Sequence, residues 1–181
     1  MKIYRIPFLK IICITCIILA IISIIQINYS DKPCGYSNNA SSPEQAVGIL
    51  LQGISQSNVE QICSITIGNG GANLTRNEIQ AHIGEIRSNL SLASAGSFNF
   101  STKVEESLDE LYELKIFYGG KQLVTTQNQQ SVALTIKVKA MGYARIINNP
   151  NKLTSRLNDK DGSPYLIIWD PNPLSSCTVS S

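Results

Sequence analysis

Apolar residues follow one another almost without a break from residue 11 to residue 27, in the stretch IICITCIILAIISIIQI. A run of this length lies at the short end of what a membrane-spanning helix needs. The basic residues before it are Lys2, Arg5 and Lys10. Because positively charged flanks stay in the cytoplasm, the pattern predicts a cytoplasmic N-terminus over 1–10, a transmembrane anchor over 11–29 and an extracytoplasmic remainder. The expected protein is a single-pass protein of the cell membrane.

A cleaved signal peptide is the alternative interpretation of the same apolar run. Cleavage needs small residues at fixed spacing after the run, and Gln26, Asn28 and Tyr29 stand there instead. Cys34 follows Asp, Lys and Pro rather than the small residues of a lipoprotein signal. The uncleaved anchor is therefore favoured.

The apolar positions become periodic after a polar stretch. Residues 30–41 read SDKPCGYSNNAS, which predicts a linker. A helix then begins, with Ser42 as N-cap, Pro43 at the first helical position and Gln45 at the capping-box position. Its apolar stripe consists of Val47, Leu50, Leu51 and Ile54. This spacing is typical of a helix with one buried face.

Two more capping boxes predict two more helices. Ser57 with Glu60 begins a short helix, which the glycines of the stretch 67–71 end. Thr75 with Glu78 begins a longer helix. Its apolar face consists of Ile79, Ile83, Ile86 and Leu90.

The apolar period then changes to two, which is typical of strands. Alternation is clearest over 98–104, 112–118 and 132–140, and YLIIW at 165–169 is the last strand. Helices followed by strands indicate an α+β fold, with about three helices packed on a curved, mainly antiparallel sheet of four or five strands. The expected domain covers 42–174, and 175–181 is a tail.

This layout resembles the NTF2-like superfamily, a cone of helices and sheet. The likeness begins at SSPEQAVGILLQGISQSNVEQIC and ends at PYLIIWDPNPL. Within the superfamily, the chain is most similar to the membrane-proximal N-terminal domain of some Gram-positive penicillin-binding proteins, in which a last strand runs into a Trp-Asp-Pro corner. The resemblance implies a non-catalytic domain over 42–174. Trp169 is expected to cap the open end of the core with its large apolar body.

One departure from those penicillin-binding proteins limits the inference. Their chains continue into a transpeptidase, and the SxxK motif of such enzymes is absent from this sequence. Transpeptidase activity is therefore not implied. The expectation is a stand-alone domain, or a remnant of a larger protein, that serves as an interaction or spacer module in the cell envelope and is related to cell-wall synthesis proteins.

The charge of the chain argues against nucleic acid as a partner. There are 15 basic and 13 acidic residues in all. Without the three basic residues before the anchor, 12 basic and 13 acidic residues remain, and they form no basic stripe. The expected partners are the membrane, through residues 11–29, and another envelope protein.

Three cysteines lie beyond the apolar run: Cys34, Cys63 and Cys177. One disulfide among them is expected in an oxidising compartment. The pair Cys63–Cys177 is preferred because both residues would sit at the ends of core elements, although the sequence leaves the connectivity open.

Recognisable catalytic chemistry is missing from the sequence. The lone histidine, His82, has no neighbouring nucleophile, and no set of ligands is spaced for zinc. We therefore expect no enzyme activity, no cofactor and no metal. The alternative is a small-ligand-binding protein or enzyme that uses the interior of the cone, and its pocket candidates are Asp109, Tyr112 and Tyr118. The favoured interpretation of these residues is that they are ordinary core or rim positions.

Overall fold

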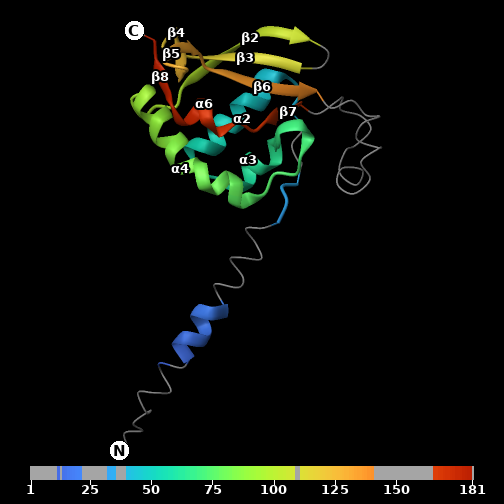
Figure 1. Ribbon diagram of the computed structural model, residues 1–181, viewed down its shortest axis with the longest axis vertical. Coiled ribbons are helices and arrows are strands. Elements are labelled where there is room, and N and C mark those ends of the chain that lie inside the picture. The colour runs from blue at the N-terminus through green and yellow to red at the C-terminus, as the bar shows by residue number, and fades with distance from the viewer. Residues whose placement is uncertain are drawn as a thin grey trace, which may run out of the picture. The chain divides into compact units, whose positions relative to one another are not determined.

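The computed structural model of this chain describes residues 12, 14–21, 32–35, 40–108, 111–140 and 165–180. The chain divides into two compact units, Met1–Lys32 and Pro33–Ser181 (Figure 1). Each unit is described by itself below.

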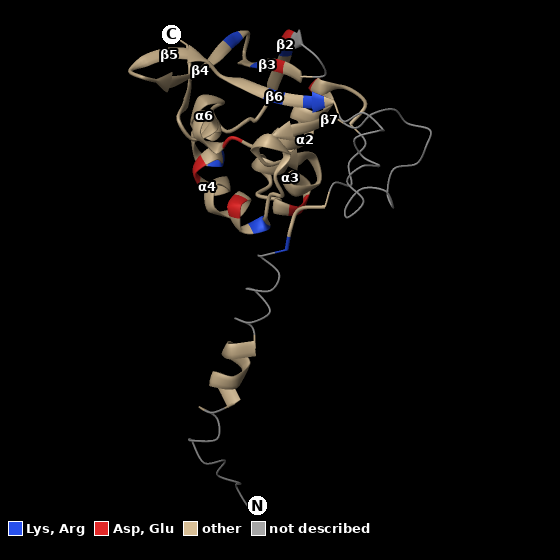
Figure 2. Cartoon of the chain, turned by 45° about the vertical axis from the view of Figure 1, so that its right-hand side comes forward, with Lys and Arg blue, Asp and Glu red and all other residues tan. Residues whose placement is uncertain are grey.

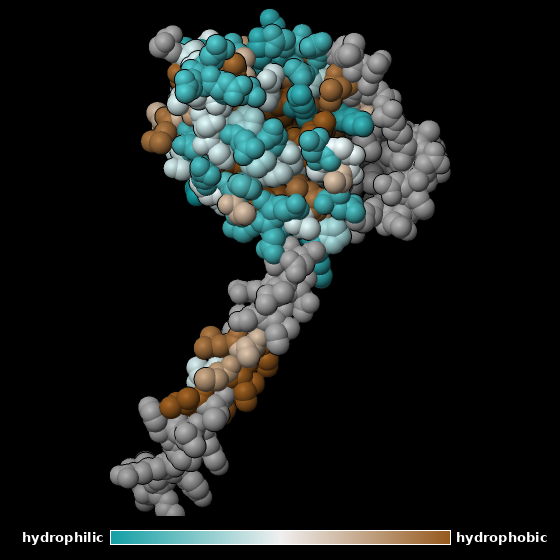
Figure 3. Space-filling view, viewed as in Figure 1, coloured by the Kyte–Doolittle hydropathy of each residue, from teal (hydrophilic) through white to brown (hydrophobic). Residues whose placement is uncertain are grey.

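In the first unit, residues 12 and 14–21 are helical and their large apolar side chains are exposed (Figure 3). Within the described residues, no helix has both the length and the apolar character that crossing a membrane requires. The predicted anchor over 11–29, and with it the single-pass membrane location, is therefore wrong.

Three helices open the second unit: α2 (Pro43–Ser55), α3 (Val59–Ile65) and α4 (Arg76–Ala93). The Ser42 hydroxyl accepts a hydrogen bond from the Gln45 amide at 3.2 Å, as a helix N-cap does. The predicted start of α2 is thus confirmed.

The starts of the other two helices differ in how well the sequence predicted them. Thr75 and Glu78 form the expected capping box, in which each side chain bonds the other residue's backbone. The N-cap of α3 is Asn58, whose side chain accepts from Gln61, rather than Ser57. Ser57 has a φ of 52°, a left-handed conformation that lies outside the helix.

The sheet contains eight strands within the described residues. They are β1 (Thr66–Ile67), β2 (Phe100–Leu108), β3 (Leu111–Tyr118), β4 (Lys121–Gln127), β5 (Gln130–Ala133), β6 (Thr135–Ala140), β7 (Tyr165–Ile168) and β8 (Cys177–Val179). The main path runs β1-β7-β6-β3-β4-β5, with β2 paired to β3 and β8 paired to β4. All pairs are antiparallel except β1 with β7.

Tight turns join the middle strands. Gly119 and Gly120 have positive φ values between β3 and β4, and Asn128 and Gln129 do the same between β4 and β5. Two consecutive residues of positive φ match the twist of a two-residue hairpin.

The predicted tail over 175–181 is part of the fold. A short helix, α6 (Pro171–Ser175), follows β7, and β8 then pairs with β4. The Asn89 side chain on α4 donates to the Ser175 carbonyl at 2.5 Å and holds α6 in place. Short elements of this kind carry no period of their own, so the predicted four or five strands are too few.

The predicted linker over 30–41 also belongs partly to the second unit. Pro33 forms a β-bridge with Thr75, and the Cys34 amide donates to the Leu74 carbonyl at 2.7 Å. Cys34 and Ala40 are both buried. These contacts fix the start of the domain against the helices.

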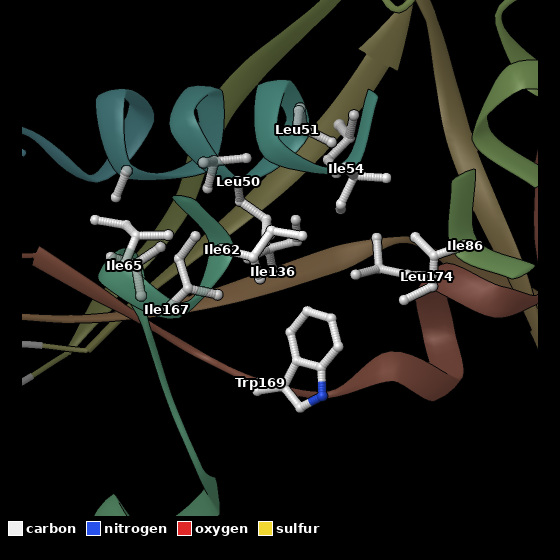
Figure 4. Close-up of a cluster of buried hydrophobic side chains, with 14 of the residues drawn as sticks. Leu50, Leu51, Ile54, Ile62, Ile65, Ile86, Ile136, Ile167, Trp169 and Leu174 are labelled. Carbon is white, nitrogen blue, oxygen red and sulfur yellow. The ribbon is translucent and has the colours of Figure 1, made fainter. Parts of the chain in front are cut away.

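Helices α2, α3 and α4 cover one face of the sheet (Figure 1). The largest fully buried side chains are Leu and Ile residues, among them Leu50, Ile62, Leu114 and Leu134. Figure 4 shows Leu50 and Ile62 within the buried cluster. The opposite face carries charged residues, with Glu113 on β3 facing Lys137 on β6. The second unit is thus an α+β fold with a dry aliphatic core on one side of its sheet.

Candidate functional site

The chain leaves the sheet at the Trp-Asp-Pro corner. The ladder between β6 and β7 has its last pair at Val138 and Ile167. Beyond it the Trp169 amide donates to the Ile67 carbonyl at 2.7 Å, so the chain stays beside β1 while it parts from β6. A gap therefore opens between the first residues of β6 and the segment 169–174.

A cleft of about 580 Å³ occupies this gap, and we call it the Trp169 cleft. Its lining residues are Leu50, Asn69, Glu113, Gln127, Thr135, Ile136, Lys137, Ile167, Ile168, Trp169, Asp170, Asn172, Pro173 and Leu174. The volume lies within the range of small-molecule sites, about 300–1,000 Å³. Aliphatic core residues form its inner end, and the amide and charged groups form the rest.

Trp169 joins the cleft to the core. Its side chain is only 7% exposed and belongs to the core cluster. In Figure 4 the six-membered ring points toward Leu50 and Ile136, and the indole nitrogen lies on the side away from them. The predicted role of Trp169 as a cap on the core agrees with this burial.

Both carboxylates of the Trp169 cleft have a local partner. Glu113 lies 3.5 Å from the Lys137 ammonium group on the neighbouring strand. The Asp170 carboxylate accepts a hydrogen bond from the Asn172 amide at 3.2 Å and caps α6. Pro171 occupies the first turn of that helix, which suits its fixed φ.

Three side-chain amides complete the polar lining. Asn69 lies in the 3₁₀-helix η1 (Asn69–Gly71), Gln127 at the end of β4 and Asn172 in α6. All three are exposed. Because each amide both donates and accepts hydrogen bonds, the lining can satisfy a ligand that carries both kinds of group.

Of the pocket candidates from the sequence, the two tyrosines lie toward opposite ends of β3 and do not meet. Tyr112 packs against Tyr165 with ring centroids 5.7 Å apart, and Tyr118 packs against Phe100 at 5.8 Å near the other end of β3. Burial raises the pKa of the Tyr165 hydroxyl above its ordinary value of 10.0, and Tyr112 adds to the effect. Asp109 lies outside the described residues.

The disulfide joins Cys34 to Cys63, so the preferred pair Cys63–Cys177 was wrong. The reason is tertiary, because the bridge between Pro33 and Thr75 carries Cys34 to the helical layer. Cys177 is free and buried on β8. Burial raises the pKa of its thiol to about 11, so it is protonated at neutral pH and a poor nucleophile.

A second cavity, of about 620 Å³, lies between the C-terminal parts of α2 and α4. Its lining residues are Ser55, Ser57, Gly84, Arg87, Ser88, Ser91, Leu92, Gly96, Ser97 and Phe98. Arg87 is the single charged residue in that lining, and no acid faces it there. Its serine-rich walls offer fewer distinct binding groups than the Trp169 cleft.

Metal chemistry finds no support in the described part of the chain. No group of three or more His, Cys, Asp or Glu side chains is placed there to hold an ion. His82 is half-buried on α4 and is not among the residues that line the two cavities.

Sequence reasoning missed most of the Trp169 cleft. It singled out Trp169 and its Asp-Pro neighbours as a corner, but not as the wall of a cleft. The amides and the Glu113–Lys137 pair come from distant segments, and no spacing in the sequence connects them. Comparison of the chain with family models, curated proteins and solved structures gives no match.

Proposed function

We propose that this protein is a non-catalytic binding module whose binding site is the Trp169 cleft. The cleft has the volume of a ligand site, an aromatic wall and several polar groups that converge on one space. The core between helices and sheet consists largely of aliphatic side chains, which favours a site at the cleft over a site in the interior of the cone.

The observation that carries this proposal is that both acids of the cleft already have structural partners. A general base must be free to take a proton from a bound reactant. Glu113 instead lies beside Lys137, and Asp170 accepts the hydrogen bond that caps α6. The cleft therefore has groups to hold a ligand, and each of its two acids already makes a structural contact, which supports binding rather than catalysis.

We also propose that the second unit is an NTF2-like domain. Three helices precede most of the strands, and these helices pack on one face of a mainly antiparallel sheet. The proposal rests on this layout, and the function proposed above does not depend on it.

The only Trp of the chain makes occupancy of the cleft directly measurable. The full chain is titrated with separate panels of neutral sugars, short peptides and nucleotides, while Trp169 fluorescence and the indole N–H resonance are recorded. We expect one panel to shift both signals saturably. Mass spectrometry of the mixture after long incubation should recover the bound compound unchanged.

Two substitutions of nearly equal shape separate binding from catalysis. Glu113→Gln and Asp170→Asn each remove a carboxylate charge and keep hydrogen-bonding capacity. If the cleft only binds, both variants should keep affinity within about threefold, because neutral hydrogen bonds of this kind contribute little each. Conversion of a bound compound that either substitution abolishes would show that the protein is an enzyme. If no panel perturbs Trp169, the cleft is not the binding site.

A further inference from the structure

The polar groups of the Trp169 cleft form a lining in which neutral hydrogen-bonding groups predominate. The lining contains three amides, Asn69, Gln127 and Asn172, and also the Thr135 hydroxyl. The amides come from three separate elements and are exposed, so they are available to a ligand. Adjacent hydroxyl groups on a ligand can each donate to an amide oxygen and accept from an amide nitrogen.

Trp169 also lines the cleft. Its side chain is more than nine-tenths buried, and the indole nitrogen lies on the side of the ring away from Leu50 and Ile136 (Figure 4). Among the described residues, the one buried side-chain nitrogen or oxygen without a hydrogen-bond partner is the Ser175 hydroxyl, so the indole N–H is not a buried donor left without an acceptor. Because an indole N–H is a hydrogen-bond donor, a ligand in the cleft that carries an acceptor can bind it.

The charges of the cleft select against an anionic ligand. Glu113 and Asp170 place two carboxylates in the lining, and Lys137 supplies one ammonium group, which already lies beside Glu113. An anion would therefore approach a lining with an excess of negative charge. Positions of both charge signs occur on the elements of the second unit (Figure 2).

From these features, and resting on the proposed function, we infer that the Trp169 cleft binds a neutral carbohydrate. The indole of Trp169 offers the C–H groups of a sugar an apolar contact at the cleft wall, and its N–H is a donor for a sugar oxygen. The amides and Thr135 bind the hydroxyl groups around it. A volume of about 580 Å³ leaves room for more than one sugar unit, so an oligosaccharide should bind more tightly than a single sugar.

An extended peptide is the main competing occupant. The β6 residues Thr135 and Ile136 pair with β3 on one side, and the ladder with β7 begins only at Val138. A peptide strand added to this edge would use backbone hydrogen bonds. It would not need the three amides or the indole donor, so the amides distinguish the two occupants.

The test uses the full chain and defined probes. Trp169 fluorescence is titrated with cellotriose, maltotriose and tri-N-acetylchitotriose as neutral probes, and with a panel of short peptides. Titrations with glucose, glucuronic acid and glucosamine then compare the affinities of similar sugar rings that are neutral, negatively charged and positively charged. We expect at least one neutral trisaccharide to shift the signal saturably, and glucuronic acid to bind more weakly than glucose.

Matched amide variants locate the binding. Asn172→Ala removes one exposed amide of the cleft and should weaken binding of the trisaccharide roughly threefold to tenfold, the effect of losing a neutral hydrogen bond or two. Asn99→Ala removes an exposed amide outside the cleft lining and should leave binding unchanged. The indole N–H resonance of Trp169 should move on binding in the wild type, because Trp169 lines the cleft.

Each other result has a definite meaning. If peptides shift the Trp169 signal and sugars do not, the carbohydrate assignment is wrong while the binding module stands. If Asn172→Ala and Asn99→Ala have equal effects, the sugar binds elsewhere on the surface and the assignment is again wrong. If no probe of any class perturbs Trp169, the proposed function fails together with this inference.

Discussion

The interior of the second unit and the Trp169 cleft meet at one residue but differ in chemistry. The largest fully buried side chains of the described residues are all Leu or Ile. The cleft beside them is lined mostly by amide, hydroxyl and charged groups. Trp169 belongs to both, because its ring packs in the core and its edge lines the cleft.

This difference separates the source of stability from the source of recognition. Burial of aliphatic side chains supplies most of the free energy of folding. The cleft amides are exposed and remain hydrated in the free protein, so keeping them costs the fold little. A protein arranged in this way should lose stability through interior substitutions and lose binding through cleft substitutions.

The largest expected effect comes from the interior. Leu114 is fully buried at the centre of β3, between β2 and β6. Leu114→Ala should lower the free energy of unfolding by about 2–5 kcal/mol, because it removes buried apolar atoms and leaves a cavity. Urea unfolding followed by circular dichroism measures the change.

Leu92 provides the matched control, since it is 78% exposed on α4. Leu92→Ala should change the free energy of unfolding by no more than about 0.5 kcal/mol. If Leu114→Ala cost as little as Leu92→Ala, the interior would not be closely packed, and the contrast between interior and cleft would disappear.

The second effect concerns the disulfide bond between Cys34 and Cys63. Cys34 and Cys63 are 29 residues apart in the sequence, and their bond closes a long loop of the unfolded chain. Replacing both with Ala should lower the free energy of unfolding by about 2–4 kcal/mol. The Trp169 emission of the folded protein should not change, because neither cysteine lines the cleft.

Cys16→Ser is the control for this pair, because Cys16 is exposed and free. It should leave the free energy of unfolding unchanged. A loss below about 1 kcal/mol in the double variant would mean that non-covalent contacts hold the segment instead. The candidates are the Cys34–Leu74 hydrogen bond at 2.7 Å and the bond from Arg76 to the Pro33 carbonyl at 3.1 Å.

Local signals in the sequence predicted much of the helical layer. The caps at Ser42 and Thr75 are short-range hydrogen bonds, and the sequence shows both partners within three residues. The start of α3 was misplaced by one residue because Ser57 and Asn58 are both good caps, and only the backbone of Ser57 excludes it. Predictions failed mainly where distant segments decide the structure.

The C-terminal segment and the disulfide are two such failures. Residues 175–181 were expected to form a tail, whereas α6 ends at Ser175 and Cys177–Val179 forms β8. Pairing of β8 with β4 joins residues about 50 positions apart, which no local pattern indicates. Cys34 follows Pro33, which pairs with Thr75, and this pairing places Cys34 beside Cys63.

The cleft was less predictable than the fold for the same reason. Its polar groups come from η1, β3, β4, β6 and α6, and each is an ordinary surface residue in its own segment. Trp169 was the one signal in the sequence, since a lone Trp before Asp-Pro marks a corner. What the corner encloses depends on where β6 and β7 part.

The smallest expected effect tests whether Asp170 serves the fold or the cleft. Its carboxylate accepts from the Asn172 amide at 3.2 Å, so Asp170→Ala should lower the free energy of unfolding by about 1 kcal/mol through loss of the N-cap. Asp170→Asn should lose much less, because Asn caps helices about as well. Urea unfolding gives both values, and the indole N–H resonance of Trp169 reports any shift of the cleft wall. If Asp170→Asn lowered the free energy of unfolding as much as Asp170→Ala, the charge of Asp170 would matter more than its hydrogen bond as N-cap. The division of the cleft residues into structural and binding groups would then be wrong.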